Sequence, residues 1–277
     1  MGAPDPCTVP DSSRETHVAP SAGGKVKLSV IIPVFNEIET IATITAQVMS
    51  VALDIRIWGD RAEDQVVRME RELVIVDDGS TDGTRAYLDT LRGQPGIQVI
   101  FHDQNQGKGG AVWTGLRQAT GDIFIIQDAD LEYDPREYPS LLKPILEHRT
   151  KVVYGSRFRG GPTKAMFFWH MVGNRFLTFV TNLLYNTILT DMETCYKAFT
   201  REVANCLHLR AKGWGFDPEI TAQILLCRYR IFEVPISYSG REFYEGKKIS
   251  WKDGFTVLGT LVSYRLRGYR PADQPGR

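Results

Sequence analysis

The sequence has no excess of charge of either sign. Lysine plus arginine number 33, and aspartate plus glutamate also number 33, so the formal net charge of the 277 residues is zero. A surface without a net positive field does not hold the phosphate backbone of a nucleic acid along its length. Nucleic acid is therefore not an expected partner.

The sequence also lacks a long apolar run. No segment offers the roughly 20 consecutive apolar residues that a membrane-spanning helix requires. The hydrophobic content of 43% is nevertheless enough to bury a substantial core. Residues 1–25 are rich in Pro, Ser, Gly, Asp and Thr and have no apolar core, which is typical of a flexible tail rather than a secretory signal. We expect a globular protein that could lie on a membrane without crossing it.

Several common signatures of chemistry are missing. The four cysteines have no C-x-x-C spacing, which argues against a zinc cluster and a disulfide framework and favours a reducing, cytosolic setting. Neither G-x-G-x-x-G at the first strand-to-helix turn nor G-x-x-x-x-G-K-[ST] is present, so dinucleotide and P-loop sites are excluded. The absence of a G-x-S-x-G elbow leaves hydrolase chemistry with little support.

Apolar runs and helical patterns alternate through the first half of the chain. This alternation predicts the α/β class, with a mostly parallel sheet and helices on both faces, and such sheets bind ligands at the carboxyl ends of their strands. The charged stretch 54–71 has no clear periodicity and is interpreted as an excursion without a function. The expected strands are 26–33, 73–76, 97–101, 123–127 and 231–236, and the expected helices are 38–51, 81–91, 110–119, 201–209 and 218–229.

A pair of carboxylates follows one of these apolar strands. Asp128 and Asp130 come directly after the strand 123–127, and Glu132 lies two residues further on. Carboxylates that converge at a strand end can hold Mg²⁺ or Mn²⁺, with substrate phosphates completing the coordination. A lone D-x-D is more often a solvated acidic turn, but the polar clusters at the neighbouring strand ends favour the metal site.

The strand that ends at residue 76 is followed by two adjacent aspartates. Asp77 and Asp78 open the sequence DDGSTDGT, and their carboxylates can accept hydrogen bonds from base N–H groups or ribose hydroxyls. Helix capping accounts for residues 80–84 but less well for two adjacent aspartates. Lys108, in the sequence QGKGG, joins the backbone N–H groups of an expected helix start in a possible anion cradle.

The first strand ends in PVFNE, which carries Pro33, Phe35 and Glu37. The aromatic ring could pack on a base, and the carboxylate could accept hydrogen bonds. By itself this motif is a weak signal, but it stands at the same predicted edge of the sheet as the two acidic motifs.

In this order the motifs resemble those of the family 2 glycosyltransferases, in particular the branch of dolichol-phosphate mannose synthase and dolichyl-phosphate glucose synthase. The resemblance runs from residue 26 to about residue 264. It rests on PVFNE, VDDGSTDGT, NQGKGGA, DADLEYDP, GSRF, GNR, DMETCYKAF and REFYEGKKISWKDG. It implies a GT-A fold and an inverting, metal-dependent transfer of a hexose from a nucleotide-diphosphate sugar, of the UDP-glucose or GDP-mannose type, to a polyprenyl phosphate. The catalytic domain would span 26–240, and 241–277 would supply a basic acceptor or phosphate loop and a helix.

The resemblance also implies roles for individual residues. Phe35 stands where this branch often has tyrosine, and Glu132 where mannose synthases often have glutamine, which leaves the base and the metal open. Asp128, Asp130 and Glu132 would surround Mg²⁺ or Mn²⁺, with Asp130 essential for catalysis. The nucleotide sugar would contact Pro33, Phe35, Glu37, Asp77, Asp78, Lys108 and Asp128.

A distributed set of basic residues belongs to the same motifs. Arginine forks and lysine charges suit a diphosphate that faces an acceptor phosphate. Asp191 or Glu193 could orient the acceptor or act as a base, and Asp191 is favoured as the catalytic residue. The expected phosphate-binding and acceptor-binding residues are Arg157, Arg175, Arg241, Lys247 and Lys248.

Residues 165–190 combine aromatic and aliphatic side chains at helical spacing, with no charge between Arg175 and Asp191. Periodicity alone fits a helix in the protein's own core as well as it fits a pair of amphipathic interface helices. The resemblance favours the interface, and so a peripheral position at the cytoplasmic face of a membrane, although a membrane-protein partner would fit the same surface.

Three rival functions share these features. The same fold and donor could serve a soluble sugar or a glycan, which lipid dependence would reveal. A sugar-nucleotide nucleotidyltransferase would need a nucleoside triphosphate, for which the sequence offers no loop. A non-catalytic binding protein would bind the donor without turnover, and the intact acidic motif argues against it.

Overall fold

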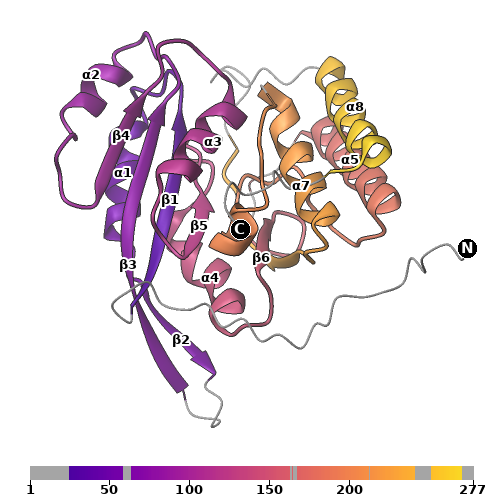
Figure 1. The fold of residues 1–277 in the computed structure, drawn as a ribbon, viewed down its shortest axis with the longest axis horizontal. Coiled ribbons are helices and arrows are strands. Elements are labelled where there is room, and N and C mark those ends of the chain that lie inside the picture. The colour runs from indigo at the N-terminus through magenta and orange to yellow at the C-terminus, as the bar shows by residue number, and fades with distance from the viewer. Residues whose placement is uncertain are drawn as a thin grey trace, which may run out of the picture.

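An eight-stranded sheet forms the centre of the computed structural model, which describes residues 25–58, 64–162, 164, 167–211, 213–240 and 251–269. Its strand order is β2-β3-β1-β5-β7-β6-β8, and β4 pairs with the second half of β3 (Figure 1). The strands are β1 (Val26–Val34), β2 (Asp54–Trp58), β3 (Asp64–Asp77), β4 (Ile97–Phe101), β5 (Ile123–Ile126), β6 (Val152–Ser156), β7 (Lys197–Thr200) and β8 (Phe232–Pro235).

Most of the strands are parallel. Strands β4, β3, β1 and β5 run in one direction, and β6 and β8 share that direction because both are related to β5 through the antiparallel strand β7. The predicted α/β class with a mostly parallel sheet is therefore confirmed. Since β7 runs in the opposite direction, its amino end lies at the same edge of the sheet as the carboxyl ends of β5 and β6.

Helices cover both faces of the sheet. Side chains of β1 alternate between the two cores: Val30 and Ile32 pack with α1 and α4, and Ile31 packs with α3 and α7. The helices are α1 (Ile41–Ser50), α2 (Thr84–Asp89), α3 (Lys108–Gln118), α4 (Tyr138–Leu146), α5 (Phe168–Tyr185), α6 (Arg201–Ala204), α7 (Phe216–Leu226) and α8 (Trp251–Arg267), with 3₁₀ turns at Pro135–Glu137 and Gly213–Gly215.

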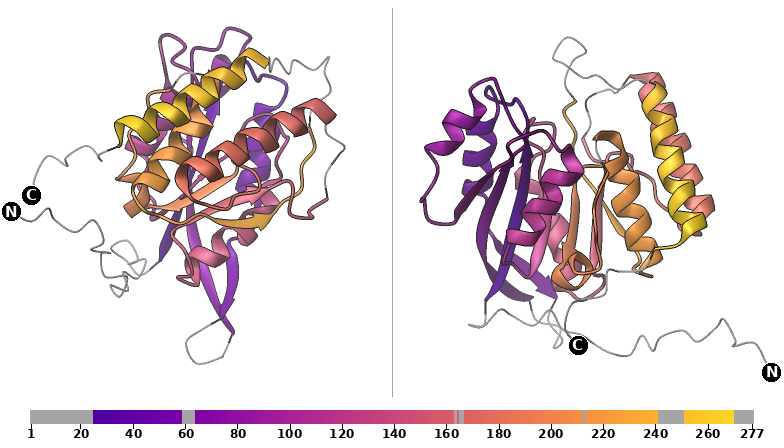
Figure 2. Two further views of the ribbon diagram at one scale, coloured as in Figure 1. Left: turned by 90° about the vertical axis from the view of Figure 1, so that its right-hand side faces the viewer. Right: turned by 45° about the horizontal axis from the view of Figure 1, so that its top comes forward.

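Helices α5 and α8 form a further layer outside α7, side by side in both views of Figure 2. Met192, Val257 and Leu261 are buried between these helices and the rest of the molecule. The described part of 165–190 thus contains one helix, not the expected pair, and the partner of that helix is α8. Among the described residues, no helix is long and apolar enough to cross a bilayer.

The interpretation of 54–71 as an irregular excursion is wrong. Strand β2 and the first residues of β3 form an antiparallel hairpin that projects from the sheet (Figure 1). Ile55 and Ile57 are buried, whereas Asp54, Arg56 and Trp58 are exposed. The alternation typical of a half-buried strand is present, but the charged residues of the exposed face obscure it.

Several expected helices are shorter in the structure. The helix predicted from residue 81 begins at Thr84, because Gly83 adopts a left-handed conformation with φ 102°. The helix predicted over 201–209 ends at Ala204, and α1 begins at Ile41 rather than at residue 38. The helix expected at 218–229 spans Phe216–Leu226.

Candidate active site

The loops after β1 and β3 are joined by side-chain hydrogen bonds. The backbone N–H of Asn36 donates to Ser80 Oγ at 2.9 Å, and that of Glu37 donates to Thr84 Oγ1 at 2.9 Å. The Asn36 amide oxygen in turn accepts a hydrogen bond from the backbone N–H of Thr81 at 2.8 Å. These contacts hold the two loops in one arrangement at the edge where the parallel strands end.

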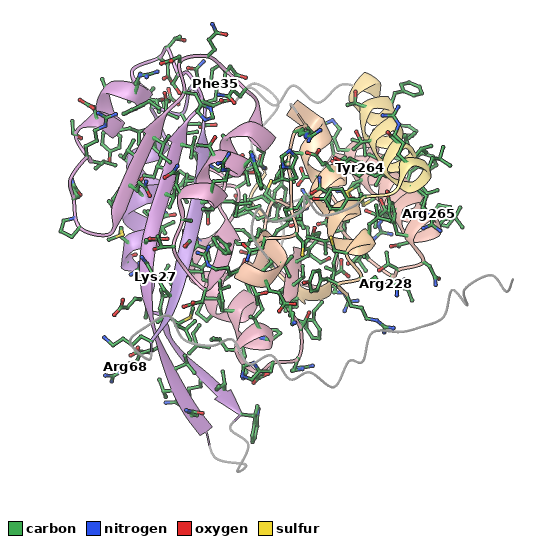
Figure 3. The ribbon with its side chains drawn as sticks, in the orientation of Figure 1. Lys27, Phe35, Arg68, Arg228, Tyr264 and Arg265 are labelled. Carbon is green, nitrogen blue, oxygen red and sulfur yellow. The ribbon has the colours of Figure 1, made fainter. Side chains whose placement is uncertain are left out.

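The aromatic residue predicted to contact a base is exposed at this edge. Figure 3 shows Phe35 at the end of the sheet opposite Lys27 and Arg68, and 47% of its surface is accessible. The Glu37 carboxylate accepts a hydrogen bond from Thr40 Oγ1 at 2.8 Å. Pro33 lies within β1, in register with Val76 of β3. Phe35 and Glu37 therefore stand at the predicted nucleotide edge, with Pro33 one step inside it.

The two adjacent aspartates differ in their surroundings. Asp78 accepts hydrogen bonds from His102 Nδ1 at 2.7 Å and from the backbone N–H groups of Gln106 at 2.8 Å and Gly107 at 2.7 Å. These bonds hold the loop that leads into α3, so in this structure Asp78 fixes the position of that loop. Asp77 is also buried, and within the described part of the chain its Oδ1 has no hydrogen-bond partner.

The start of α3 places a lysine against the acidic motif. Lys108 Nζ lies 2.7 and 2.9 Å from the two carboxylate oxygens of Asp128 and donates to Cys195 Sγ at 3.2 Å. Burial works to raise the pKa of Asp128, but the Lys108 ammonium outweighs it and the pKa is lowered. Burial likewise opposes the charge of Lys108, yet Asp128 raises the lysine pKa well above its usual value. Asp128 therefore already holds a cationic group.

The closeness of α3 to the loop before α7 depends on a glycine. A Cβ atom at Gly109 would collide with the backbone carbonyl of Ala211. We expect Gly109→Ala to destabilise the protein by about 1–3 kcal/mol, because the helix start must move. Urea unfolding measures the effect. Gly173→Ala in α5, where a Cβ meets nothing within 4 Å, is the control and should be neutral or stabilising. Equal stability of the two variants would contradict the prediction.

The carboxylates predicted to bind a metal are near one another in sequence, but by themselves they do not form a complete set of metal ligands. The backbone N–H of Glu132 donates to Asp130 Oδ1 at 3.1 Å, and Glu132 Oε2 accepts from the Tyr238 hydroxyl at 2.8 Å. Among the described residues, no group of three His, Cys, Asp or Glu side chains is arranged to hold a metal ion. The donor chemistry nevertheless fits Mg²⁺ or Mn²⁺, since such sites need one or two carboxylates and take further oxygens from phosphates and water.

A buried arginine follows β6 and meets the segment before β7. Arg157 Nε and Nη2 donate to the two carboxylate oxygens of Asp191 at 2.7 and 2.8 Å, and Asn174 of α5 donates to the same carboxylate at 3.1 Å. Burial lowers the pKa of Arg157, but Tyr133 and Asp191 overcome it and raise that pKa well above its usual value. Both oxygens of Asp191 are engaged by protein donors, which suits orientation of Arg157 better than uptake of a proton.

The remaining predicted cations fall into two groups. Arg175 is exposed on α5, and its guanidinium lies 5.3 Å from the ring centroid of Phe158, next to Arg157 in the sequence. The structure therefore brings Arg157 and Arg175 to one side of the site. Arg241, Lys247 and Lys248 lie outside the described residues, and their predicted role stays a prediction.

Sequence reasoning missed a second buried ion pair. Lys197, the first residue of β7, pairs with Asp217 in the first turn of α7 and also donates to the Thr194 carbonyl. Its side chain is fully buried, with the ammonium 4.9 Å from the ring centroid of Tyr154. The one available signal was a lysine within the apolar sequence YKAF, because a lysine is almost never fully buried unless it is paired.

Together these groups define a class of protein. The order of this mixed sheet, with helices on both faces, is that of the GT-A glycosyltransferase fold. The model of Glycosyl transferase family 2 matches residues 29–207, more than half of the chain, and the chain belongs to that family.

Curated relatives are less than 30% identical to this chain in sequence. Undecaprenyl-phosphate mannosyltransferase of Micrococcus luteus is 28% identical over 234 residues, which cover 80% of this chain and 87% of that protein. Dolichol-phosphate mannosyltransferase of Pyrococcus furiosus is 27% identical over 245 residues, which cover 87% of this chain and 64% of that protein.

Solved structures share the fold. Glucosyl-3-phosphoglycerate synthase of Mycobacterium tuberculosis, in complex with Mn²⁺, UDP and glucosyl-3-phosphoglycerate, matches with a TM-score of 0.60 at 21% identity, covering 86% of this chain and 79% of that one. The same enzyme with Mn²⁺, UDP-glucose and phosphoglyceric acid gives a TM-score of 0.59 at 22% identity, with coverage of 87% and 80%. The likeness establishes the GT-A fold.

Proposed function

We propose that this family 2 glycosyltransferase moves a hexose from a nucleotide-diphosphate sugar to a polyprenyl phosphate at a membrane surface, with inversion at the anomeric carbon. One observation supports a lipid as the acceptor. Helix α5 contacts the site through the hydrogen bond from Asn174 to Asp191, while its other side exposes large apolar residues. A lipid phosphate held at Arg157 would thus have an apolar surface beside it. The names of the Micrococcus and Pyrococcus relatives support the same acceptor class.

The donor would lie along the edge formed by the loops after β1, β3 and β5. Phe35 offers an exposed ring for a base, and UDP-glucose or GDP-mannose would fit this description. A Mg²⁺ or Mn²⁺ ion bound by Asp128 and Asp130 would neutralise charge on the leaving diphosphate. Lys108 contacts Asp128 directly, so it is positioned to bind a diphosphate oxygen at the same place.

The acceptor phosphate needs to be held in position more than it needs to lose a proton. A lipid phosphate is already anionic near neutral pH, so it can attack without a strong general base. Arg157 presents a planar fork that suits phosphate oxygens, and Asp191 fixes the orientation of that fork. The protein therefore contributes orientation and charge screening at this step.

The exposed face of α5 fits a membrane surface. Exposed apolar side chains on a helix next to a site for a lipid phosphate would be buried in the headgroup region, as in interfacial amphipathic helices. On the neighbouring helix α8, Phe255, Val262 and Leu266 are also exposed. The exposed large residues in and beside α5 are Phe167, Phe168, Trp169, Val172, Phe176, Phe179, Leu183 and Ile188.

Two charges on this face are expected to release the protein from membranes. The double variant Phe179→Asp and Leu183→Asp should bind vesicles at least about tenfold more weakly, because burial of each apolar side chain contributes about 1.5–3 kcal/mol. Co-sedimentation with liposomes measures the change. Trp58→Asp is the control, since Trp58 is 67% exposed but lies on the β2–β3 hairpin, away from α5. Unchanged vesicle binding of the double variant would rule out this face as the contact.

The proposal is tested by offering purified protein a panel of labelled nucleotide sugars, including UDP-glucose and GDP-mannose, with Mn²⁺ or Mg²⁺ and a short polyprenyl phosphate. Metal-dependent transfer of one sugar into the organic phase is the expected result. If the donor is consumed only with a soluble phosphorylated or glycan acceptor, the glycosyltransferase assignment stands and the lipid acceptor is wrong.

A further inference from the structure

Glu193 lies among the ion pairs of the site and has a buried oxygen without a partner among the described residues. It lies between Asp191 and Lys197, in the segment that leads into β7, and is partly buried. Within the described part of the chain, its Oε1 is buried and has no hydrogen-bond partner. Asp191 is paired with Arg157, and Asp217 is paired with Lys197. Glu193 thus lies between two aspartates that each pair with a cation, while one of its own oxygens has no partner.

The charges around Glu193 oppose its ionisation. Three buried or half-buried cations are each paired with an aspartate, in the pairs Arg157–Asp191, Lys197–Asp217 and Lys108–Asp128. An ionised Glu193 would add a net negative charge. Burial first, and then Asp217 and Asp191, raise the pKa of Glu193 to about 8 against the opposing effect of Lys197 and Arg157. Near neutral pH the side chain is therefore mainly a neutral acid, which has a proton to donate.

We propose that Glu193 binds a substrate phosphate as the protonated acid, donating a hydrogen bond from its carboxyl group to a phosphate oxygen. A carboxylate at this place would repel the anion, whereas the acid form removes the repulsion and supplies a donor where the protein supplies no partner. The inference rests on the proposed function only for the identity of the phosphate, which belongs to either the donor diphosphate or the lipid acceptor.

Phosphate binding and protonation of Glu193 must then be linked. A bound anion favours the neutral acid, so by reciprocity the acid form binds the anion more tightly. Affinity should be level from pH 7 towards 8 and should fall above pH 8, by up to about tenfold for each further pH unit. The fall arises because Glu193 must take up a proton before it can bind.

Glutamine is a neutral isostere of the protonated acid and separates this role from others. We expect Glu193→Gln to keep wild-type affinity at pH 7 and to lose the decline between pH 8 and 9.5. The same protein samples are titrated calorimetrically with UDP or GDP alone and with farnesyl phosphate alone. If the affinity of the wild-type protein declines with pH for the nucleotide, Glu193 contacts the donor diphosphate. If it declines for farnesyl phosphate, Glu193 contacts the acceptor phosphate. Glu202→Gln, on the surface at the Lys151 ion pair, should keep the wild-type decline.

Two results would overturn the inference. If Glu193→Gln binds normally but loses turnover at every pH, the residue acts as a general base. If the variant keeps the wild-type decline in both arms, Glu193 does not contact the phosphate. Transfer of labelled sugar is measured separately on the wild-type protein. If phosphate binding depends on pH as described but no sugar is transferred, the proposed function is wrong and the role of Glu193 stands. If sugar is transferred but phosphate binding does not depend on the protonation of Glu193, the proposed function stands and the role of Glu193 is wrong.

Discussion

Replacing Asp130 with alanine is expected to reduce sugar transfer by more than about 100-fold, the scale of losing one group that stabilises charge in a transition state. Asp130 follows β5 at the edge of the sheet and is only partly buried, so the truncation leaves the core intact. The contact known to be lost is the hydrogen bond that its carboxylate accepts from the Glu132 backbone N–H. The rate is measured with saturating donor and Mn²⁺ or Mg²⁺, and circular dichroism confirms the fold.

The control for this experiment is an aspartate a few residues further along. Asp134→Ala removes a carboxylate that pairs with Arg136 at the surface, and its transfer rate should stay close to that of the wild type. A direct Mn²⁺ titration adds a measurement that does not depend on turnover, and Asp130→Ala should bind the ion more weakly. Near-normal turnover of Asp130→Ala would show that the acidic motif does not serve a metal-dependent transfer.

The fold was predictable where one strand is buried on both faces. The apolar runs that became β1, β4 and β5 were located to within one residue. Continuous burial leaves a continuous apolar sequence in β1 and β5, whereas β4 is only partly buried but keeps an apolar sequence with one polar residue, Gln98. The β2–β3 hairpin was missed because its exposed face carries charge. The strand β7, with four residues, was not predicted, and its antiparallel direction follows from pairing with β5 and β6, which is not a local property of its sequence.

The sequence could place the motifs after β1, β3 and β5 at one edge of the sheet, because the carboxyl ends of parallel strands meet there, but it could not give their contacts. The roles of these residues stay predictions. The sequence could not show that Asp78 is turned towards His102, or that Asp191 engages Arg157. The pair of Lys197 with Asp217 joins β7 to α7, and such partners are set by tertiary packing. Residue types therefore indicated the chemistry, and the structure assigned the partners.

Replacing Arg157 with leucine is expected to destabilise the protein by about 3–5 kcal/mol, the usual effect of removing one partner of a buried ion pair. Asp191 is fully buried, and it would lose the guanidinium that pairs with both of its carboxylate oxygens. Urea unfolding at pH 7 measures the loss. The double variant Arg157→Leu with Asp191→Leu should recover part of the stability, because no unpaired charge remains. Both variants should lack transfer activity, since neither can hold the acceptor phosphate.

The surface pair of Lys151 with Glu202 provides the contrast. Its side chains are 35% and 47% exposed, so Lys151→Met should change stability by no more than about 1 kcal/mol. If Arg157→Leu were equally mild, Asp191 would have to find other donors, and Arg157 would not be held in place by this pair. Activity would then separate two roles: an inactive but stable Arg157→Leu shows that the guanidinium serves the substrate alone, whereas a stable and active variant removes Arg157 from the acceptor site.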